Sequence, residues 1–222
     1  MLPTPTVKNI DYNRVYEPSE DTFLLLDCFE NESDQLKRDN NGKVPIVVEI
    51  GIGSGVITTF VKQNILPNAV MIATDINLHA CKTALETASI NKQSFEVCRM
   101  NLTRGIKSNI IDILIFNPPY VPSESLPKPS NLSGSGSWED TEWLDLALLG
   151  GEDGMVVTWK LLNDLSEILT PGNGVAYVLF CARNNPERVS SIMRSRGWKV
   201  DTIITRKAGW EVLSVLKFQQ VV

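Results

Sequence analysis

The stretch Glu49–Gly55, which reads Glu-Ile-Gly-Ile-Gly-Ser-Gly, decides the fold of this chain. It overlaps the end of the apolar, β-branched run Pro45–Ile50 and leads into Ser54–Leu66, whose apolar spacing is that of a helix. Glycines let the backbone turn tightly from a strand into a helix and approach a ligand closely. The stretch therefore predicts the first strand, turn and helix of an α/β sheet, with a ligand at the turn.

Similar apolar runs recur along the chain and alternate mostly with segments of helical length. The strands that we expect are Pro45–Ile50, Ala69–Thr74, Phe95–Met100, Ile111–Phe116 and Val175–Cys181. The helices that we expect are Ser54–Leu66, Asn77–Asn91, Met155–Leu169 and Pro186–Arg196. This rhythm predicts an α/β fold with a parallel sheet and helices on both of its faces.

The last two apolar runs, Lys199–Thr205 and Trp210–Phe218, are separated only by a short turn around Ala208 and Gly209. A helix has no room between them, so they are expected to form an antiparallel hairpin. This hairpin would close a sheet of seven strands. A dinucleotide-binding fold would instead keep alternating strands and helices.

One domain is expected over residues 1–222, because a chain of this length with 43% apolar residues can bury a full core. The N-terminal part, residues 1–43, is expected to contain a helix at Glu20–Glu30 that Ser19 caps. The beginning of the chain thus adds a helix in front of the first strand.

Two segments are expected to be irregular. Asn31–Lys43 is polar and predicts a connection between the first helix and the first strand. Val121–Ser137 is dense in proline, serine and glycine, which predicts a flexible surface loop. We assign residues 121–154 as a whole to a loop region on the substrate side.

The overall charge argues against nucleic acid as the main substrate. The net charge is −5 and the pI is about 5.0, so the chain offers no general field that attracts phosphate backbones. No signal sequence and no run of about 18 apolar residues occurs, so we expect no membrane partner. A cytoplasmic location is expected, with the nucleus as a second compartment.

The cysteines and the histidine do not predict a metal site. Cys28, Cys81, Cys98 and Cys181 are scattered and form no Cys-x-x-Cys pair, so they are expected to be reduced, buried thiols. His79 has no second ligand near it in the sequence, which favours a surface or capping role. Catalysis by a Ser/His or Cys/His pair therefore has no support.

Glu49 stands just ahead of the glycine turn, where a carboxylate can bind the ammonium group of a methionine moiety. Gly51, Gly53 and Gly55 form a Gly-x-Gly-x-Gly pattern, whereas the dinucleotide fingerprint is Gly-x-Gly-x-x-Gly. Beside a pyrophosphate the acid would repel its ligand. The pattern favours S-adenosylmethionine as cofactor, and a plain glycine-rich loop or an NAD site remains an alternative.

Two further strand ends carry polar residues. Asp75 ends the second strand, where a carboxylate can accept both hydroxyls of a ribose, although it could instead cap the helix that follows. Asn101 and Leu102 end the third strand, where an amide can meet the amino group of adenine and a leucine can cover its ring. Because carboxyl ends of parallel strands face one crevice, these residues together predict a nucleoside-type ligand.

The four residues Asn117, Pro118, Pro119 and Tyr120 follow the fourth strand. An amide or aryl amine nitrogen is a poor nucleophile, because its lone pair is delocalised. The Asn117 side-chain oxygen and the Pro118 carbonyl can accept its two N–H bonds and direct the lone pair at a methyl sulfonium. Tyr120 can stack on the flat amide, and the two proline rings stiffen the turn. The tetrad therefore predicts substrate binding and methyl transfer to a planar nitrogen without a metal.

Together these motifs resemble the HemK family of protein glutamine N5-methyltransferases, and within it the eukaryotic branch that modifies peptide-chain release factors. The segments Val15–Asp27 and Ala208–Phe218 look like the corresponding segments of that branch, so the likeness covers nearly the whole chain. The resemblance implies the seven-stranded class I methyltransferase fold. It also implies a substrate, which is the glutamine in the Gly-Gly-Gln loop of the class 1 release factor.

The resemblance further implies residue roles. Thr22 is expected to line the cofactor pocket, Glu49, Gly51 and Asp75 to bind the methionine and ribose parts, and Asn117 to hold the substrate glutamine. Two features depart from the family pattern. Relatives often have aspartate where this chain has Asn101, and Trp143–Gly154 matches the substrate-side loop only loosely.

Eukaryotic members of the family are similar in requiring a small zinc-binding activator subunit, which adds to the edge of the sheet. The strand within Ser94–Met100 is expected to lie at that edge, and Phe95, Val97 and Cys98 suit such a contact. Ordinary core packing is the alternative reading of these three side chains. The resemblance thus implies a heterodimer.

Three other functions stay open at this point. An N6-adenine nucleic-acid methyltransferase would offer the same two N–H donors to the tetrad. A protein lysine methyltransferase is a second alternative, although a flexible cation has little need of a planar clamp. A noncatalytic binding subunit that kept the fold is the third, and the intact Glu49, Asp75 and Asn117 argue against it.

Overall fold

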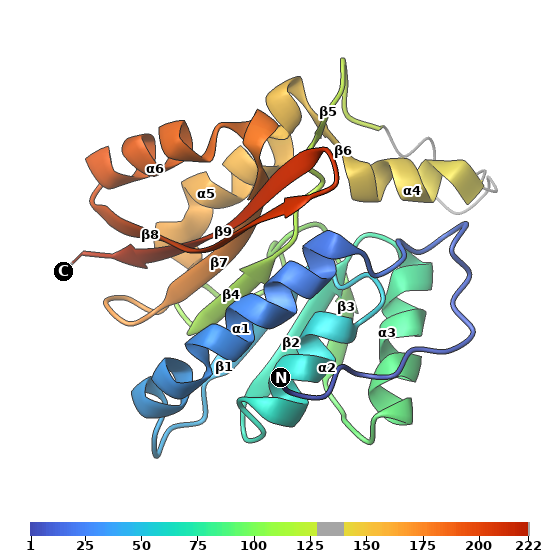
Figure 1. The fold of residues 1–222 in the computed structure, drawn as a ribbon. Helices are drawn as coiled ribbons and strands as arrows, with labels where there is room; N and C mark the ends of the chain where they lie inside the picture. The colour runs from blue at the N-terminus through green and yellow to red at the C-terminus, as the bar shows by residue number, and fades with distance from the viewer. Residues whose placement is uncertain (128–139, 222) are drawn as a thin grey trace.

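The computed structural model describes residues 1–127 and 140–221, and these contain a seven-stranded sheet (Figure 1). In their order across the sheet, the strands are β3 (Glu96–Arg99), β2 (Val70–Asp75), β1 (Ile46–Ile50), β4 (Ile113–Phe116), β7 (Val175–Cys181), β9 (Glu211–Gln220) and β8 (Trp198–Ala208). The strands from β3 to β7 are parallel, and β9 is antiparallel to both β7 and β8. The predicted sheet and its closing hairpin are therefore confirmed.

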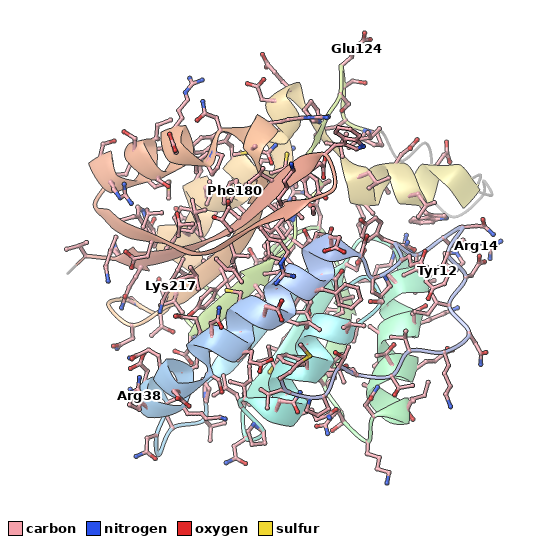
Figure 2. The ribbon with its side chains drawn as sticks, viewed as in Figure 1. Tyr12, Arg14, Arg38, Glu124, Phe180 and Lys217 are labelled. Atoms are coloured by element: carbon pink, nitrogen blue, oxygen red, sulfur yellow. The ribbon has the colours of Figure 1, made fainter. Side chains whose placement is uncertain are left out.

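Helices cover both faces of the sheet, as predicted. The first face carries α1 (Glu20–Asp39), α2 (Val56–Asn64) and α3 (Leu78–Ile90), and the second carries α5 (Val156–Ile168) and α6 (Pro186–Ser195). Val47 of β1 packs in the first core and its neighbour Val48 in the second, because successive strand residues point to opposite faces. Phe180, labelled in Figure 2, belongs to the second core. No helix in the described part of the chain is long and apolar enough to span a membrane.

The strand order reverses between β1 and β4. From β1 the chain goes to β2 and β3 on one side, and then returns to place β4 on the other side. Ile50 and Phe116, the last residues of β1 and β4, are register partners. In parallel α/β sheets the crevice outside the carboxyl ends at such a reversal is where ligands bind. The topology therefore locates the site.

The first helix is longer than the sequence analysis predicted. α1 begins at Glu20 as expected but continues to Asp39, so the polar connection expected at Asn31–Lys43 is wrong over most of its length. Phe29, Ser33 and Leu36 are buried and lie four and three residues apart, which is the spacing of one helix face. Polar residues on the exposed face of α1 made this helical spacing hard to detect in the sequence.

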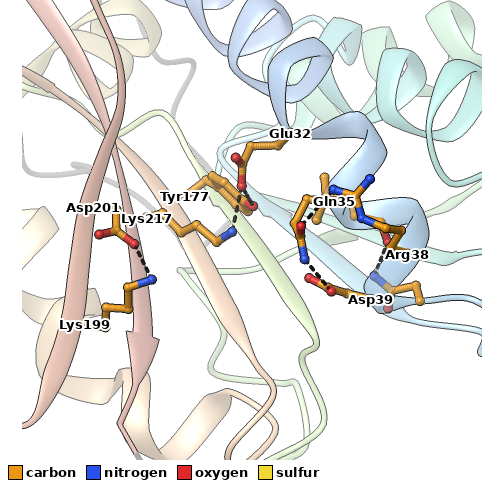
Figure 3. A network of polar contacts seen from close by, with 10 residues as sticks. Glu32, Gln35, Arg38, Asp39, Tyr177, Lys199, Asp201 and Lys217 are labelled. Carbon is orange, nitrogen blue, oxygen red and sulfur yellow. Dashed lines mark hydrogen bonds and ion pairs between the residues drawn. The ribbon is translucent and has the colours of Figure 1, made fainter.

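Polar contacts attach α1 to the far half of the sheet (Figure 3). The Glu32 carboxylate accepts a hydrogen bond from the Tyr177 hydroxyl at 2.8 Å and pairs with the Lys217 ammonium at 2.7 Å. Asp27 pairs with Arg206 of β8. Because Glu32 and Lys217 are mostly shielded from water, losing one would leave the other charge poorly solvated. These contacts hold the middle of α1 against the sheet.

β3 is the outermost strand on its side, as expected. Phe95, however, is buried in the first core, so the edge contact expected of its side chain is wrong and the core reading is correct. Phe95 directly precedes β3, and its ring packs on the face of the sheet that α1, α2 and α3 cover. Val97 is half-buried and also packs against the first core, whereas Cys98 is half-buried in the same outer strand.

The region 121–154 contains regular structure that was not predicted. Its elements are β5 (Val121–Pro122), α4 (Asp140–Leu148), β6 (Leu149–Gly151) and the 3-10 helix η1 (Glu152–Gly154), and β5 pairs in parallel with β6. Residues 128–137 of the expected flexible loop lie outside the described residues. His79 is half-buried, and its ring meets Trp143 of α4 edge-on with centroids 5.6 Å apart. Such a tertiary contact leaves no local pattern in the sequence.

Gly55 tests the packing of α2 on α3. Its φ is +80°, and a Cβ added there would lie 2.7 Å from the Ala84 Cα. We expect Gly55→Ala to lower the free energy of unfolding by roughly 2–4 kcal/mol, because left-handed strain and a backbone clash add. Urea denaturation measures this. Gly42→Ala is the control, since Gly42 has a φ of +74° but open space around it, and about 1 kcal/mol is expected. Equal losses would contradict the steric account.

Candidate active site

A cavity of about 350 Å³ opens at the carboxyl ends of β1, β2 and β4. Its wall includes every residue to which the sequence analysis gave a site role: Thr22, Glu49, Gly51, Gly53, Asp75, Asn101, Leu102, Asn117, Pro118, Pro119 and Tyr120. They come from α1 and from the ends of four strands. The fold thus gathers all the predicted residues around one space.

The glycine turn forms the floor between β1 and α2. The Gly51 N–H donates to the Thr74 carbonyl at 2.8 Å, and the Gly53 N–H donates to Asp75 Oδ2 at 3.1 Å. Gly51 and Gly53 have φ values of +69° and +52°, a conformation that side chains rarely adopt. The turn is therefore tied to the end of β2, and its glycines are required by backbone shape.

Glu49 is the most deeply buried acid of the cavity wall, with 1% of its surface exposed. Its carboxylate accepts hydrogen bonds from the Thr58 N–H at 2.8 Å and from the Thr58 hydroxyl. Burial outweighs these hydrogen bonds and raises the pKa of Glu49 to about 8. A cationic group that entered the cavity beside Glu49 would offset this cost.

Asp75 lies across the turn from Glu49. Its Oδ1 accepts the Asn77 N–H at 2.8 Å, and burial raises the pKa of Asp75 to about 6. The N-cap of α3 is Asn77, whose side chain accepts the His79 N–H at 2.8 Å. Asp75 is therefore not the N-cap of α3, although its Oδ1 bonds the backbone N–H of the N-cap residue.

Asn77 is a residue that the sequence analysis did not single out. It is buried, lines the cavity, and its Nδ2 donates to the Arg14 carbonyl at 2.7 Å. It thereby ties the N-terminal segment to the site. Nearby, Asn101 and Leu102 follow β3 in the cavity wall, and Leu102 has a φ of +52°.

Asn117 leads the tetrad at the end of β4. Its Nδ2 donates to Asp21 Oδ2 at 3.0 Å. Its Oδ1 is buried and accepts no hydrogen bond from the described residues. Tyr120 lies two residues beyond the first proline, and burial followed by the Asp21 charge raises the pKa of its hydroxyl. The cavity wall thus offers a buried acceptor on Asn117 and a phenol on Tyr120 that stays neutral.

The sequence analysis did not identify the residues that pack against the backbone of Pro119 and Tyr120. A Cβ at Gly150 would lie 2.2 Å from the Pro119 carbonyl oxygen, and one at Gly154 would lie 1.9 Å from the Tyr120 carbonyl oxygen. Asn184, in the 3-10 helix η2 (Ala182–Asn184), donates to the Tyr120 carbonyl at 2.9 Å. The glycines at 150, 151 and 154 were the available signal in the sequence.

Asp21 was also missed. An acid in the first turn of a helix is usually explained by the helix dipole, so the pattern gave no reason to select it. In the structure it is buried, with 3% exposed, and lines the cavity beside Tyr16 and Asn117. Burial and then the Asp21 charge raise the pKa of Tyr16 to about 12. Residues 1–127 and 140–221 hold no group of three or more metal-ligating side chains.

The arrangement suits two ligands side by side. Acids at Glu49 and Asp75 match a ligand that carries a cation and hydroxyl groups. Asn117 follows β4, the strand that pairs with β1, and its free Oδ1 matches a group that brings N–H donors. The cavity can therefore bring a donor molecule and a planar nitrogen together.

Known proteins resemble this chain along most of its length. A model described as Methyltransferase small domain matches residues 20–127. The eRF1 methyltransferase catalytic subunit mtq2 of Schizosaccharomyces pombe is 36% identical over 234 residues, covering 100% of this chain and 97% of that protein. Methyltransferase HEMK2 of Homo sapiens is 36% identical, covering 93% of this chain and 90% of that protein.

Among solved structures, a chain of the E. cuniculi Mtq2-Trm112 complex matches with a TM-score of 0.66 and 24% identity, over 94% of this chain and 99% of that one. This likeness shows a shared fold. The sequence identity to mtq2 and HEMK2 shows membership of their family, because it extends over nearly the whole of each sequence. This chain therefore belongs to the methyltransferase family of mtq2 and HEMK2, and it is an enzyme.

Proposed function

We propose that this chain transfers the methyl group of S-adenosylmethionine to the side-chain amide nitrogen, N5, of the glutamine in the Gly-Gly-Gln loop of the class 1 release factor, in the cytoplasm. The observation that carries the proposal is the buried Oδ1 of Asn117, which accepts no hydrogen bond from the described residues. Leaving such an acceptor unpaired is costly, and an amide N–H of a substrate would satisfy it. The S. pombe relative is named as an eRF1 methyltransferase, which supports this choice of substrate.

The cavity wall fits S-adenosylmethionine. Glu49 would bind the ammonium of its methionine part, Asp75 would accept the ribose hydroxyls, and Asn101 with Leu102 would face the adenine. Thr22 closes the wall from α1. When bound, this cofactor supplies a sulfonium methyl group that is already activated for transfer.

The tetrad would orient the substrate nitrogen. Asn117 Oδ1 and the Pro118 carbonyl would accept the two N–H bonds of the amide, which turns its π face and lone pair toward the methyl group. Tyr120 would limit rotation of the flat amide. A lysine side chain is flexible and gains little from two fixed acceptors. An adenine amine offers the same N–H bonds and is the rival that the experiment below separates.

A small zinc-binding activator subunit is the second partner of this proposal, with β3 as the contact strand. The Met100 N–H donates to the Asp75 carbonyl of β2, so alternation along the strand points the Val97 N–H away from β2. α3, which packs against β3, exposes Leu85 and Ile90. The E. cuniculi relative occurs in a complex with Trm112, which supports a small partner subunit.

Asn117→Ala tests the proposed reaction. We expect cofactor affinity to stay within about twofold of the wild type, while kcat/KM for the release factor falls by roughly 100-fold or more, because the fixed acceptor is lost. Radiolabelled methyl transfer to the release factor measures this, with the glutamine of the factor changed to alanine as the substrate control. Asn31→Ala, at an exposed position of α1, is the matched enzyme control. Transfer to the alanine form of the factor, or to nucleic acid instead, would contradict the proposal.

Cofactor binding should release a proton from Glu49. Near pH 7 the carboxyl is mostly protonated, because its pKa is about 8, whereas Asp75 with a pKa of about 6 is mostly ionised. An ammonium placed beside Glu49 lowers that pKa, so nearly one proton leaves and cofactor affinity rises from about pH 6 to about pH 8. Titration calorimetry in two buffers of different ionisation enthalpy detects the proton. The release should vanish in Glu49→Gln and persist in Asp75→Asn. Heats that do not depend on the buffer would contradict this role of Glu49.

Val97→Pro tests the edge contact. Proline removes the N–H that points away from β2, so an added strand loses a hydrogen bond while the pairing with β2 is kept. We expect the affinity for the small subunit to fall by about tenfold or more in a pull-down titration, with cofactor affinity unchanged. Ile203→Pro is the matched control, because Ile203 is the unpaired residue at the irregularity of the opposite outer strand, β8. A loss of affinity that is the same in both variants would argue against β3 as the contact.

A further inference from the structure

The first turn of α1 places a buried carboxylate against the side chain that leads the tetrad. Asp21 Oδ2 accepts the Nδ2–H of Asn117 at 3.0 Å, and Asp21 Oδ1 accepts the backbone N–H of Thr22 at 2.7 Å. Both oxygens of the carboxylate therefore have donors. The residues come from elements 96 positions apart in the sequence.

This contact decides which way the Asn117 amide points. The two ends of an asparagine amide are nearly the same in shape, and only hydrogen bonding distinguishes them. The oxygens of a carboxylate accept hydrogen bonds, so the NH2 end of Asn117 faces Asp21. The oxygen then faces the other way, which agrees with its being buried and without a partner among the described residues.

We propose that Asp21 is a positioning residue that sets the amide orientation of Asn117 and thereby makes the site select an NH2 group over a carboxylate. This inference rests on the proposed function and adds a source of specificity to it. With Oδ1 of Asn117 presented to the substrate, a glutamine side chain satisfies it by donating, whereas a glutamate side chain has only acceptors to offer. The Pro118 carbonyl is a fixed acceptor, but Asn117 adds to this selection only in the orientation that Asp21 sets, because a turned Asn117 would present donors.

Asp21→Asn changes the orientation without changing the size of the side chain. The Thr22 N–H and the Thr22 hydroxyl both donate to Oδ1 of Asp21, at 2.7 and 3.4 Å, so the oxygen of the new amide would face Thr22. Its NH2 would then face Asn117, and Asn117 would turn to present its oxygen to position 21. The NH2 of Asn117 would face the substrate, where two sets of donors would oppose each other.

The experiment compares the wild type with Asp21→Asn and with Asp34→Asn, which makes the same change at an exposed position of α1. The substrates are the release factor and the same factor with glutamate in place of the target glutamine. For Asp21→Asn we expect kcat on the glutamine factor and affinity for it, measured with S-adenosylhomocysteine present, to fall by about 10- to 100-fold. Cofactor affinity and the melting temperature should stay close to those of the wild type, and Asp34→Asn should behave as the wild type.

The Asn117→Ala background separates the effect of Asp21 on the orientation of Asn117 from the effect of the Asp21 charge. Removing the Asp21 charge favours the glutamate factor by simple electrostatics, so the neutral glutamine factor is the decisive substrate. If Asp21 acts through Asn117, Asp21→Asn should change the affinity for the glutamine factor by less than about twofold in an Asn117→Ala background. A loss of affinity as large as in the wild-type background would overturn the inference.

An NMR measurement that does not depend on enzymatic activity tests the inference when the variant does not fold or the wild type does not methylate the factor. The side-chain NH2 of Asn117, assigned by NMR as the signal that disappears in Asn117→Ala, should be protected from hydrogen exchange in the free wild type and exposed in Asp21→Asn. An unprotected NH2 in the wild type would overturn the inference even where the variant fails to fold. If the wild type does not methylate the glutamine factor, the proposed function fails, and this NMR result still decides whether Asp21 orients Asn117.

Discussion

The parallel pairing of β1 with β4 is the contact on which the site depends. Their last residues, Ile50 and Phe116, are opposite each other, so the glycine turn and the tetrad leave the sheet side by side. A Cβ at Gly51 would lie only 3.9 Å from the carbonyl oxygen of Asn117. A shift of one residue in this register would turn Glu49 to the other face of the sheet. The buried β-branched residues on both faces of these strands hold the register. The register in turn fixes the distance between the glycine turn and the tetrad.

Around this pairing, the cavity is acidic and poorly solvated. Glu49, Asp75 and Asp21 lie in its wall, and burial raises the pKa values of the first two. Burying carboxylates costs free energy unless a cation or hydrogen-bond donors compensate. A cofactor with an ammonium and a sulfonium and a substrate with N–H donors would supply this compensation. The electrostatic cost of these buried carboxylates therefore favours ligands that carry positive charge or hydrogen-bond donors.

The tetrad is stiff because it is held on two sides. The backbone of the glycine-rich segment at 150–154 packs so closely on Pro119 and Tyr120 that a side chain has no room there, and Asn184 bonds the Tyr120 carbonyl. From the opposite side, α1 brings Asp21 to Asn117, and the pairing of Glu32 with Lys217 helps to hold that helix on the sheet. Orientation of a weak nucleophile requires such rigidity, because a displacement of about 1 Å already costs much of the rate. In the proposed reaction, catalysis would depend mainly on the placement of the substrate nitrogen.

Local sequence determined the strands, most of the helices, the glycine turn and the tetrad, because each is a contiguous pattern whose spacing or composition reflects its own backbone. It also determined that Glu49, Asp75 and Asn117 would meet, since parallel strands bring their carboxyl ends to one edge. Only the tertiary structure decided the length of α1 beyond Glu30, the existence of α4 and the inward position of Phe95, because these depend on which surfaces are covered. Only the tertiary structure, too, paired Asp21 with Asn117. A hydrogen bond between a helix and a distant strand end leaves no period in the sequence, although it decides which end of an amide the substrate meets.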